Sequence, residues 1–386
     1  MRNIWKRIAA AALALAMCLS FAGCYDENKT WAARQGDDEL PIGAYIYYLY
    51  SAYLEAGSQV DSETAVLDAE IEGQDAQQWI KDLALNYVQA YYYIGDKFDE
   101  LGLELTEEDL ENVENTAINF WNYYGSTLEE LGISQDSFEK AYALYGEKFQ
   151  QVMKAMYAEG GELALEDGAL EEYYCGAYTS YEYFSASLTT TNEDGESVDL
   201  TDEEKADLKE TFQGYVEKIN AGDLTMSEAA DEYAEESGTE SSFMGPVCVK
   251  SENMSTEVFE ALNSVKEGEA AFVESTSGYL VVRKLSVKDY YDEYIASDED
   301  QLFNLLTELK GEEYSDYVLE QAASVEGVEL NQAAMDSIKV SSLVDDSNRN
   351  GTSSAEETES SSSSSADENS SEEESSSSET SSSETE

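Results

Sequence analysis

Histidine is absent from the 386 residues of the chain, and proline occurs only twice. Without imidazole the protein contains no serine–histidine–aspartate triad, no zinc site with histidine ligands and no histidine acid or base. The apolar stripes of its helices have the pattern of a hydrophobic core and give no reason to invoke a cofactor. We therefore expect neither a bound metal nor a cofactor.

Basic residues are also scarce. The chain has 21 Lys and Arg against 84 Asp and Glu, and its formal net charge is −63. A negative field of this size repels nucleic acid and anionic phospholipid surfaces, so neither is an expected partner. The same field keeps the chain soluble and favours basic or cationic partners.

The first two dozen residues have the pattern of an export signal. Three basic side chains precede an apolar run at 8–21, which is too short for a stable membrane span. The run leads into the tetrapeptide FAGC, which ends at Cys24 and resembles the lipobox of bacterial lipoproteins. The resemblance implies a signal peptide at 1–23, lipidation of Cys24 and an extracytoplasmic chain anchored to the outer face of the cytoplasmic membrane. An ordinary secretory signal that contains a cysteine is the alternative.

Two further cysteines, Cys175 and Cys248, belong to the expected mature chain. An exported protein can pair such thiols, but a disulfide needs its two Cα atoms within about 7 Å of each other. The sequence does not set that distance. A disulfide and two free thiols therefore both stay open.

The first part of the mature chain has a helical pattern. Residues 24–38 are polar and are expected to form a tether, and the apolar spacing over 39–177 predicts an all-helical domain. Thr106, followed by acidic residues, indicates a helix start, and Gly125 indicates a helix end. The expected helices cover 41–56, 77–101, 106–124 and 135–159.

The pattern changes at residues 178–288, where short runs of strand-forming residues alternate with helical segments. Thr201 with Glu204, and Thr225 with Glu228, have the spacing of a capping box and indicate two helix starts. Strands are expected at 181–188, 243–249, 270–274 and 279–285, with a further helix at 256–264. This order predicts an α+β module with helices packed on a small antiparallel sheet.

The last part of the chain divides into two segments. Residues 289–340 return to a helical pattern and are expected to complete the first helical domain. Residues 341–386 are rich in Ser and Glu and have almost no apolar side chains, so a disordered tail is expected. The predicted fold class is α+β multidomain.

Three short motifs follow one another in the second half of the module: MSTEVFEAL at 254–262, VKEGE at 265–269 and SGYLVV at 277–282. In this order they resemble the parvulin-type peptidyl-prolyl isomerases. The lipobox, helical domain, module and closing helices together resemble the PrsA/SurA group of exported foldases. That resemblance spans about residues 40–340 and implies a first domain of the SurA-N-like chaperone type.

The resemblance also implies a site. A parvulin module lowers the barrier of about 18–20 kcal/mol to rotation of a prolyl amide, by holding the ring in an apolar pocket beside polar groups. Met254 and Phe259 would line the pocket, and ordinary core positions are the alternative for both. Tyr183 and Leu280 occupy the two histidine positions of the family, and Cys248 follows a reduced glycine-rich segment. Leu280 cannot donate a hydrogen bond, so weak or no isomerase activity is implied.

The function implied by the resemblance is an extracytoplasmic folding factor that holds unfolded or partly folded exported polypeptides. Tyrosine provides a large contact area with few rotatable bonds, so the helical domain is expected to bind these clients. The candidates are Tyr47, Tyr48, Tyr91 and Tyr92, although more than half of the clustered aromatic residues must be core. Two alternatives stay open: an active peptidyl-prolyl isomerase, and a solute-binding lipoprotein of a transporter, which needs two α/β lobes.

Overall fold

The computed structural model describes residues 26, 29–192 and 195–343. The predicted signal peptide, its lipidation site Cys24 and most of the predicted tail at 341–386 lie outside these residues. Among the described residues, none of the helices combines the length and the apolar character that a membrane span requires.

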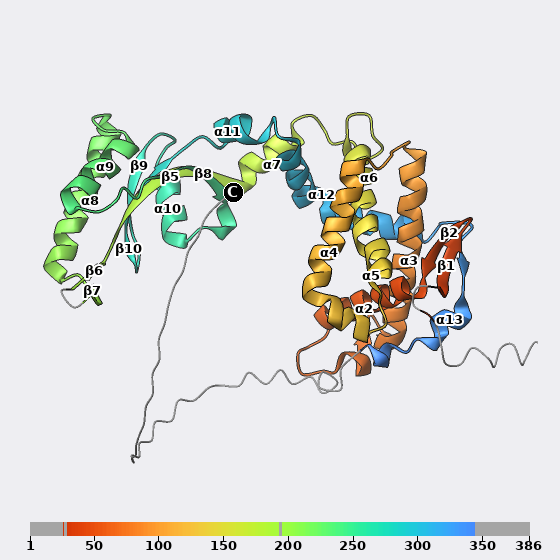
Figure 1. The fold of residues 1–386 in the computed structure, drawn as a ribbon. Coiled ribbons are helices and arrows are strands. Elements are labelled where there is room, and N and C mark those ends of the chain that lie inside the picture. Colours follow the sequence, from red (N-terminus) through yellow and green to blue (C-terminus); the bar gives the residue numbers. More distant parts are fainter. Residues whose placement is uncertain (1–25, 27–28, 193–194, 344–386) are drawn as a thin grey trace, which may run out of the picture.

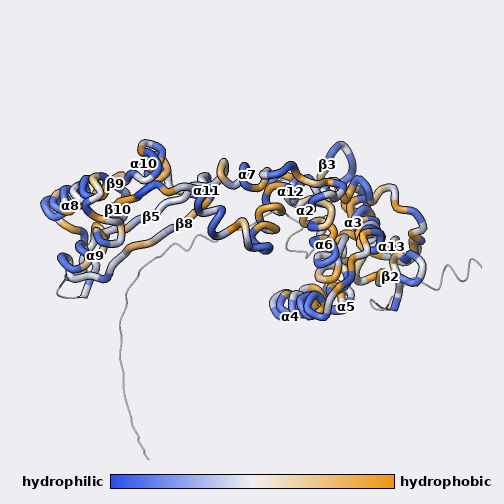
Figure 2. Tube along the Cα trace, turned by 90° about the horizontal axis from the view of Figure 1, so that it is seen from above, coloured by the Kyte–Doolittle hydropathy of each residue, from blue (hydrophilic) through white to orange (hydrophobic). Residues whose placement is uncertain are grey.

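The described chain forms two lobes that lie end to end (Figure 1). One lobe is mainly helical, and the other is a small sheet with packed helices. Seen from above, the same extended arrangement has helices α7 and α11 between the lobes (Figure 2). The predicted α+β multidomain fold class is therefore confirmed.

The helical lobe is built around two packed helices, α2 and α3. Asp75 caps α3, because its carboxylate accepts hydrogen bonds from the backbone N–H groups of Gln77 and Gln78 at 3.1 and 3.2 Å. Helix α12 returns from the far end of the chain and packs against α3, with Tyr314 fully buried in the shared core. The elements of this lobe are α2 (Ile42–Ser58), α3 (Ala76–Glu100), α4 (Glu107–Glu130), α5 (Gln135–Phe138), π-helical segment η2 (Glu139–Leu144), α6 (Tyr145–Tyr157) and α12 (Glu299–Ala322).

Helix α4 is longer than expected. It begins at the predicted capping box, in which the Thr106 hydroxyl and the Asp109 carboxylate satisfy each other's backbone N–H groups. The prediction that Gly125 ends it is wrong, because the helix continues to Glu130. A Cβ atom on Gly125 would lie 2.7 Å from the indole of Trp121. The absence of a side chain at Gly125 therefore leaves room for the Trp121 ring next to it.

The predicted tether at 24–38 is wrong from residue 31 onward. Strand β1 (Trp31–Gln35) pairs with β2 (Asp38–Pro41) and with β11 (Glu329–Leu330) in a three-stranded sheet of order β11-β1-β2. Ala32 and Ala33 are fully buried by this pairing. The residues around this strand are mostly polar, so the local sequence pattern did not indicate it. Its second partner, β11, lies almost 300 residues further along the sequence.

The second lobe contains a four-stranded antiparallel sheet of order β8-β5-β10-β9. Side chains alternate along β5, so Phe184 and Ala186 pack under α8 and α9, whereas Tyr181 and Tyr183 face α10. Both predicted capping boxes of this lobe are present. Its elements are β5 (Tyr178–Ser187), α8 (Asp202–Ala221), α9 (Met226–Ser237), β8 (Met244–Lys250), α10 (Thr256–Ser264), β9 (Ala270–Glu274) and β10 (Gly278–Lys284).

The junction between the lobes is formed by α7 (Ala169–Ala177), α11 (Val287–Tyr290) and the first half of α12. Glu308 of α12 accepts hydrogen bonds from the hydroxyls of Tyr173 and Tyr178 at 2.5 and 2.6 Å. The ammonium group of Lys250 lies 3.0 Å from the same carboxylate. One side chain of the helical lobe is thereby bound to β5 and β8 of the sheet lobe.

Removing the Glu308 carboxylate is expected to loosen this junction. Burial opposes its charge, but the hydrogen bonds from Tyr173, Tyr178 and Lys250 outweigh burial and lower the pKa of Glu308 below 4.5. Because the pKa of Glu308 is lower in the folded than in the unfolded state, its ionised carboxylate stabilises the folded arrangement fully above the unfolded pKa. This stabilisation is lost as the pH falls through the folded pKa. Glu308→Ala should raise amide hydrogen exchange at the start of β5 about tenfold at neutral pH.

The matched control for the junction is Glu312→Ala, which removes an exposed carboxylate from the same helix. It should leave exchange in β5 unchanged. Equal exchange rates in wild type and Glu308→Ala would show that the carboxylate does not hold the lobes together.

Candidate functional site

The structure brings three of the predicted isomerase-site residues together. Tyr183, Met254 and Leu280 belong to one apolar cluster between the sheet and α10. The ring of Tyr183 stacks on that of Tyr181, with centroids 5.7 Å apart. Leu280 lies on the neighbouring strand β10, opposite Ser185. Within this apolar cluster the phenols of Tyr181 and Tyr183 can donate hydrogen bonds, whereas the side chain of Leu280 cannot.

The structure does not bring the other two predicted residues to this cluster. Phe259 lies on the outer side of α10 and is 37% exposed, whereas its neighbour Val258 packs against the cluster. Cys248 pairs with Ser180 on the opposite face of the sheet, because alternate residues of β5 point to opposite sides. Burial raises the pKa of the Cys248 thiol, so it is not an activated nucleophile. Both Cys175 and Cys248 are free thiols.

The helical lobe contains an open aromatic cleft of about 420 Å³. We call it the aromatic cleft and define it by its lining residues, which come from α2, α3, η2, α6 and α12. They are Tyr47, Tyr48, Ser51, Tyr87, Ala141, Tyr142, Tyr145, Gly146, Phe149, Ser315, Val318 and Leu319. None of these lining side chains is charged. The cleft therefore offers rings, aliphatic carbon and neutral hydroxyls to a ligand.

The π-helical segment η2 positions one wall of the cleft. A π-helix has more residues per turn than an α-helix, so the side chains of η2 point in other directions than they would in an α-helix. The backbone carbonyl of Ala141 accepts a hydrogen bond from the buried Tyr48 hydroxyl at 3.2 Å. Tyr142 remains 38% exposed at the rim. Burial raises the pKa of Tyr47 to about 12, so this phenol stays protonated at neutral pH.

The rings continue from the rim of the cleft onto helix α4. The ring centroid of Tyr142 lies 5.4 Å from that of Phe120, and Phe120 lies 4.6 Å from Tyr124. Tyr123 follows at 6.5 Å from Tyr124. Tyr123 is 83% exposed and Tyr124 is 54% exposed. We call the series from Tyr47 through Tyr142 to Tyr123 the aromatic track.

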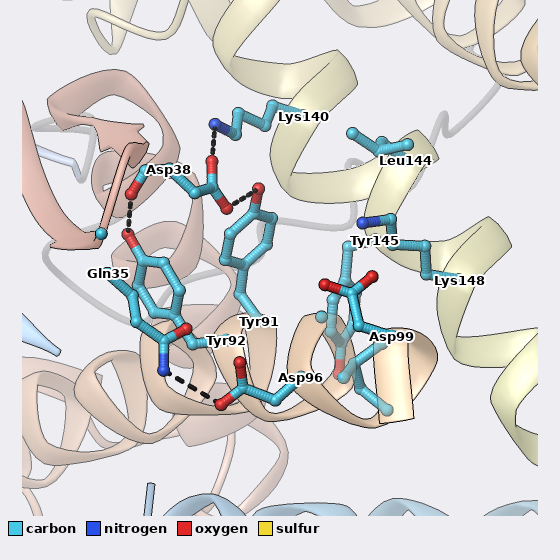
Figure 3. Close-up of a pocket in the computed structure, with 13 residues that line it drawn as sticks. Gln35, Asp38, Tyr91, Tyr92, Asp96, Asp99, Lys140, Leu144, Tyr145 and Lys148 are labelled. Atoms are coloured by element: carbon cyan, nitrogen blue, oxygen red, sulfur yellow. Dashed lines mark hydrogen bonds and ion pairs between the residues drawn. The ribbon is translucent and has the colours of Figure 1, made fainter. Parts of the chain in front are cut away.

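The four tyrosines that sequence reasoning proposed as client contacts divide into two pairs. Tyr47 and Tyr48 line the aromatic cleft. Tyr91 and Tyr92 instead line a separate polar pocket of about 510 Å³ (Figure 3). Tyr145 borders both cavities.

The polar pocket fastens the β1–β2 hairpin to the helices. The Tyr91 hydroxyl donates to the Asp38 carboxylate at 3.1 Å, and Lys140 binds the other carboxylate oxygen at 2.6 Å (Figure 3). Tyr92 donates to the backbone carbonyl of Asp38 at 3.4 Å. Burial, with the Asp38 charge, raises the pKa of Tyr91. These partners are mutually satisfied, which gives Tyr91 and Tyr92 a structural role.

Sequence reasoning missed Tyr142 as a rim residue and missed Tyr123 and Tyr124 altogether. Tyr142 has the spacing of a core residue, but it lies in the π-helical segment η2 and is 38% exposed. Tyr123 and Tyr124 precede Gly125, a residue type that is typical of helix ends but lies inside α4 here. No local signal in the sequence separates these tyrosines from the many that are buried. In the described residues, no group of three acidic or cysteine side chains is placed to hold a metal ion.

Comparison with known proteins gives structural neighbours only. No family model and no curated protein matches the chain. It is similar to the foldase protein PrsA of Lactococcus lactis, with 13% identity, a TM-score of 0.35, and coverage of 79% of this chain and 96% of that one. For PrsA of Streptococcus pneumoniae the identity is 15% and the TM-score 0.33, with coverage of 67% of this chain and 88% of that one. For PrsA of Bacillus subtilis the identity is 12% and the TM-score 0.28, with coverage of 72% of this chain and 99% of that one. With TM-scores below 0.5 these neighbours do not decide the function, which depends on the side chains of this chain.

Proposed function

We propose that this protein is an extracytoplasmic folding factor, anchored through Cys24, that holds unfolded segments of exported polypeptides. The observation that carries the proposal is the open aromatic cleft and its continuation into the exposed rings of Tyr123 and Tyr124. A contiguous exposed apolar surface on a soluble lobe marks a binding site for another molecule. The solved PrsA neighbours are named foldases, in line with this role.

The size and chemistry of the cleft suit reversible binding. A buried aromatic side chain covers about 150–250 Å², and apolar burial contributes roughly 25 cal/mol per Å², so one ring gains about 4–6 kcal/mol. Association itself costs about 4–15 kcal/mol, and ordering an unfolded segment costs more. A single ring therefore binds weakly. A client that places several apolar side chains along the aromatic track binds better and still dissociates.

The cluster around Tyr183 supports contact with apolar side chains but weak or no isomerisation. A twisted prolyl amide is stabilised by hydrogen-bond donors near its carbonyl oxygen. Leu280 offers none, and Cys248 lies on the opposite face of the sheet. A solute-binding role is disfavoured, because the described chain has one four-stranded antiparallel sheet and no pair of α/β lobes.

The proposed function predicts a split between two assays on the mature full chain. It should suppress light scattering by a chemically unfolded client at a few-fold molar excess, because the aromatic cleft captures apolar segments. In a protease-coupled assay on a proline peptide, it should give less than about tenfold acceleration over buffer, equal to about 1.4 kcal/mol of barrier. Unchanged client aggregation would refute the holding function. Fast isomerisation would instead establish the active-isomerase alternative.

A further inference from the structure

The charged residues of helix α4, which carries the exposed end of the aromatic track, are all acidic. Glu139 lies in η2, the segment that carries Tyr142, and its pKa is raised by burial and by the carboxylates of Asp136 and Glu114. Glu114 lies in α4 and Asp136 in α5, and α4 packs against η2, the two elements that carry Phe120 and Tyr142. At the other end, burial and the Glu55 carboxylate raise the pKa of Tyr87. We call Glu114, Asp136 and Glu139 the rim carboxylates.

The nearest lysines are directed away from the cleft. Lys140 lines the polar pocket, where it binds Asp38 at 2.6 Å. Lys148 lines the same pocket and lies over the ring of Phe98 at 5.1 Å. Neither is among the lining residues of the aromatic cleft. A ligand that extends from the cleft along the aromatic track onto α4 therefore meets a helix whose charged side chains are all acidic, within a chain whose formal charge is −63.

Exposed rings reinforce this charge preference. A Lys or Arg side chain over the face of an exposed tyrosine gains about 0.5–1 kcal/mol. Tyr123 and Tyr124 present such faces on α4, the helix that also carries Glu114. A basic side chain beside an apolar one can thus use a ring and a carboxylate at the same time.

We propose that the aromatic cleft selects client segments in which large apolar residues are flanked by lysine or arginine. This inference rests on the proposed folding-factor function and names the substrate class of its site. Apolar side chains occupy the cleft, and the flanking cations lie against the rim carboxylates and the exposed rings of the aromatic track. Segments flanked by Glu or Asp are repelled, so the site discriminates against acidic stretches such as the chain's own Ser/Glu-rich region.

The test uses three fluorescent peptides that share one aromatic core and carry Lys, Ser or Glu flanks. Fluorescence anisotropy with the mature full chain should show the Lys-flanked peptide binding at least about tenfold more tightly than the Glu-flanked one at 10 mM salt, where the Debye length is about 30 Å. At 1 M salt, where it is about 3 Å, the difference should fall below about threefold.

The outcomes separate this inference from the proposed function. Equal affinity of all three peptides would overturn the charge selection and leave the folding-factor function standing. Binding of none of them at either salt concentration would overturn both. Tightest binding of the Glu-flanked peptide would contradict the selection directly.

A pair of triple variants tests whether the rim carboxylates provide the selection. Glu114→Gln, Asp136→Asn and Glu139→Gln together should reduce the Lys-to-Glu preference at least about threefold. The control, Glu257→Gln, Glu260→Gln and Glu267→Gln, removes the same charge from exposed positions of the sheet lobe and should leave the preference unchanged. Equal loss in both triples would refute the assignment to the rim carboxylates. Thermal melting of each variant checks that its fold is intact.

Discussion

Substituting Gly146 by tryptophan is expected to abolish most client binding. Gly146 lines the aromatic cleft, and a Cβ atom built on it meets no other atom within 4 Å. An indole at this position can therefore enter the cleft without displacing the backbone. A cleft of about 420 Å³ that is filled in this way has little volume left for a client side chain. Suppression of aggregation should fall at least about tenfold, which corresponds to roughly 1.4 kcal/mol.

The helix itself should tolerate the change. Glycine is about 1 kcal/mol less favourable than alanine in a helix interior, and tryptophan is a better helix former than glycine. The stability of the helical lobe should therefore not decrease. A lower melting temperature together with lost binding would indicate misfolding in place of occlusion.

Two controls separate occlusion from a general effect. Gly146→Ala adds only a methyl group and should keep the binding of the wild type. Gly214→Trp places the same indole on α8 of the sheet lobe, where a Cβ atom also meets nothing within 4 Å. It should suppress aggregation as well as wild type. Undiminished binding by Gly146→Trp would show that clients bind elsewhere.

The elements with strong local signals could be predicted from the sequence. The capping boxes at Thr201 and Thr225 correctly marked the starts of α8 and α9, because side chain and backbone satisfy each other within four residues. The predicted helix at 256–264 matches α10, Thr256–Ser264. A run of strand-forming residues at 181–188 likewise indicated β5.

Features that depend on distant partners could not be predicted. β1 is stabilised by pairing Ala33 with Leu330, and no local pattern reports a partner so far along the chain. The same limit applies to the candidate site. Tyr47 and Tyr91 are identical in type and lie in similar stripes, yet one lines the cleft and the other binds Asp38. Their roles are set by how η2 and the β1–β2 hairpin pack on α2 and α3.

Of the substitutions considered, truncating Phe138 is expected to cause the largest decrease in the free energy of unfolding. Its side chain is fully buried, and its ring lies 4.8 to 5.3 Å from the rings of Phe120, Tyr142 and Tyr47. Phe138→Ala removes the ring that joins α5 to α2 and α4 and leaves a cavity beneath the rim. A buried Phe→Ala change costs about 3–5 kcal/mol, of which lost aromatic pairing contributes about 0.5–1.5 kcal/mol per pair.

Denaturant unfolding of the full chain measures this loss, provided that the two lobes are followed by separate probes, since a two-lobed chain need not unfold in one step. Phe138→Ala should lower the midpoint of the helical lobe, and Phe138→Leu should lower it by less than half as much, because leucine refills most of the volume. Phe184→Ala, at an equally buried position under α8, should instead lower the midpoint of the sheet lobe. A cost below about 1 kcal/mol for Phe138→Ala would mean that the rings around it close the cavity. The aromatic track would then be a deformable surface, and client binding by this variant should survive the truncation.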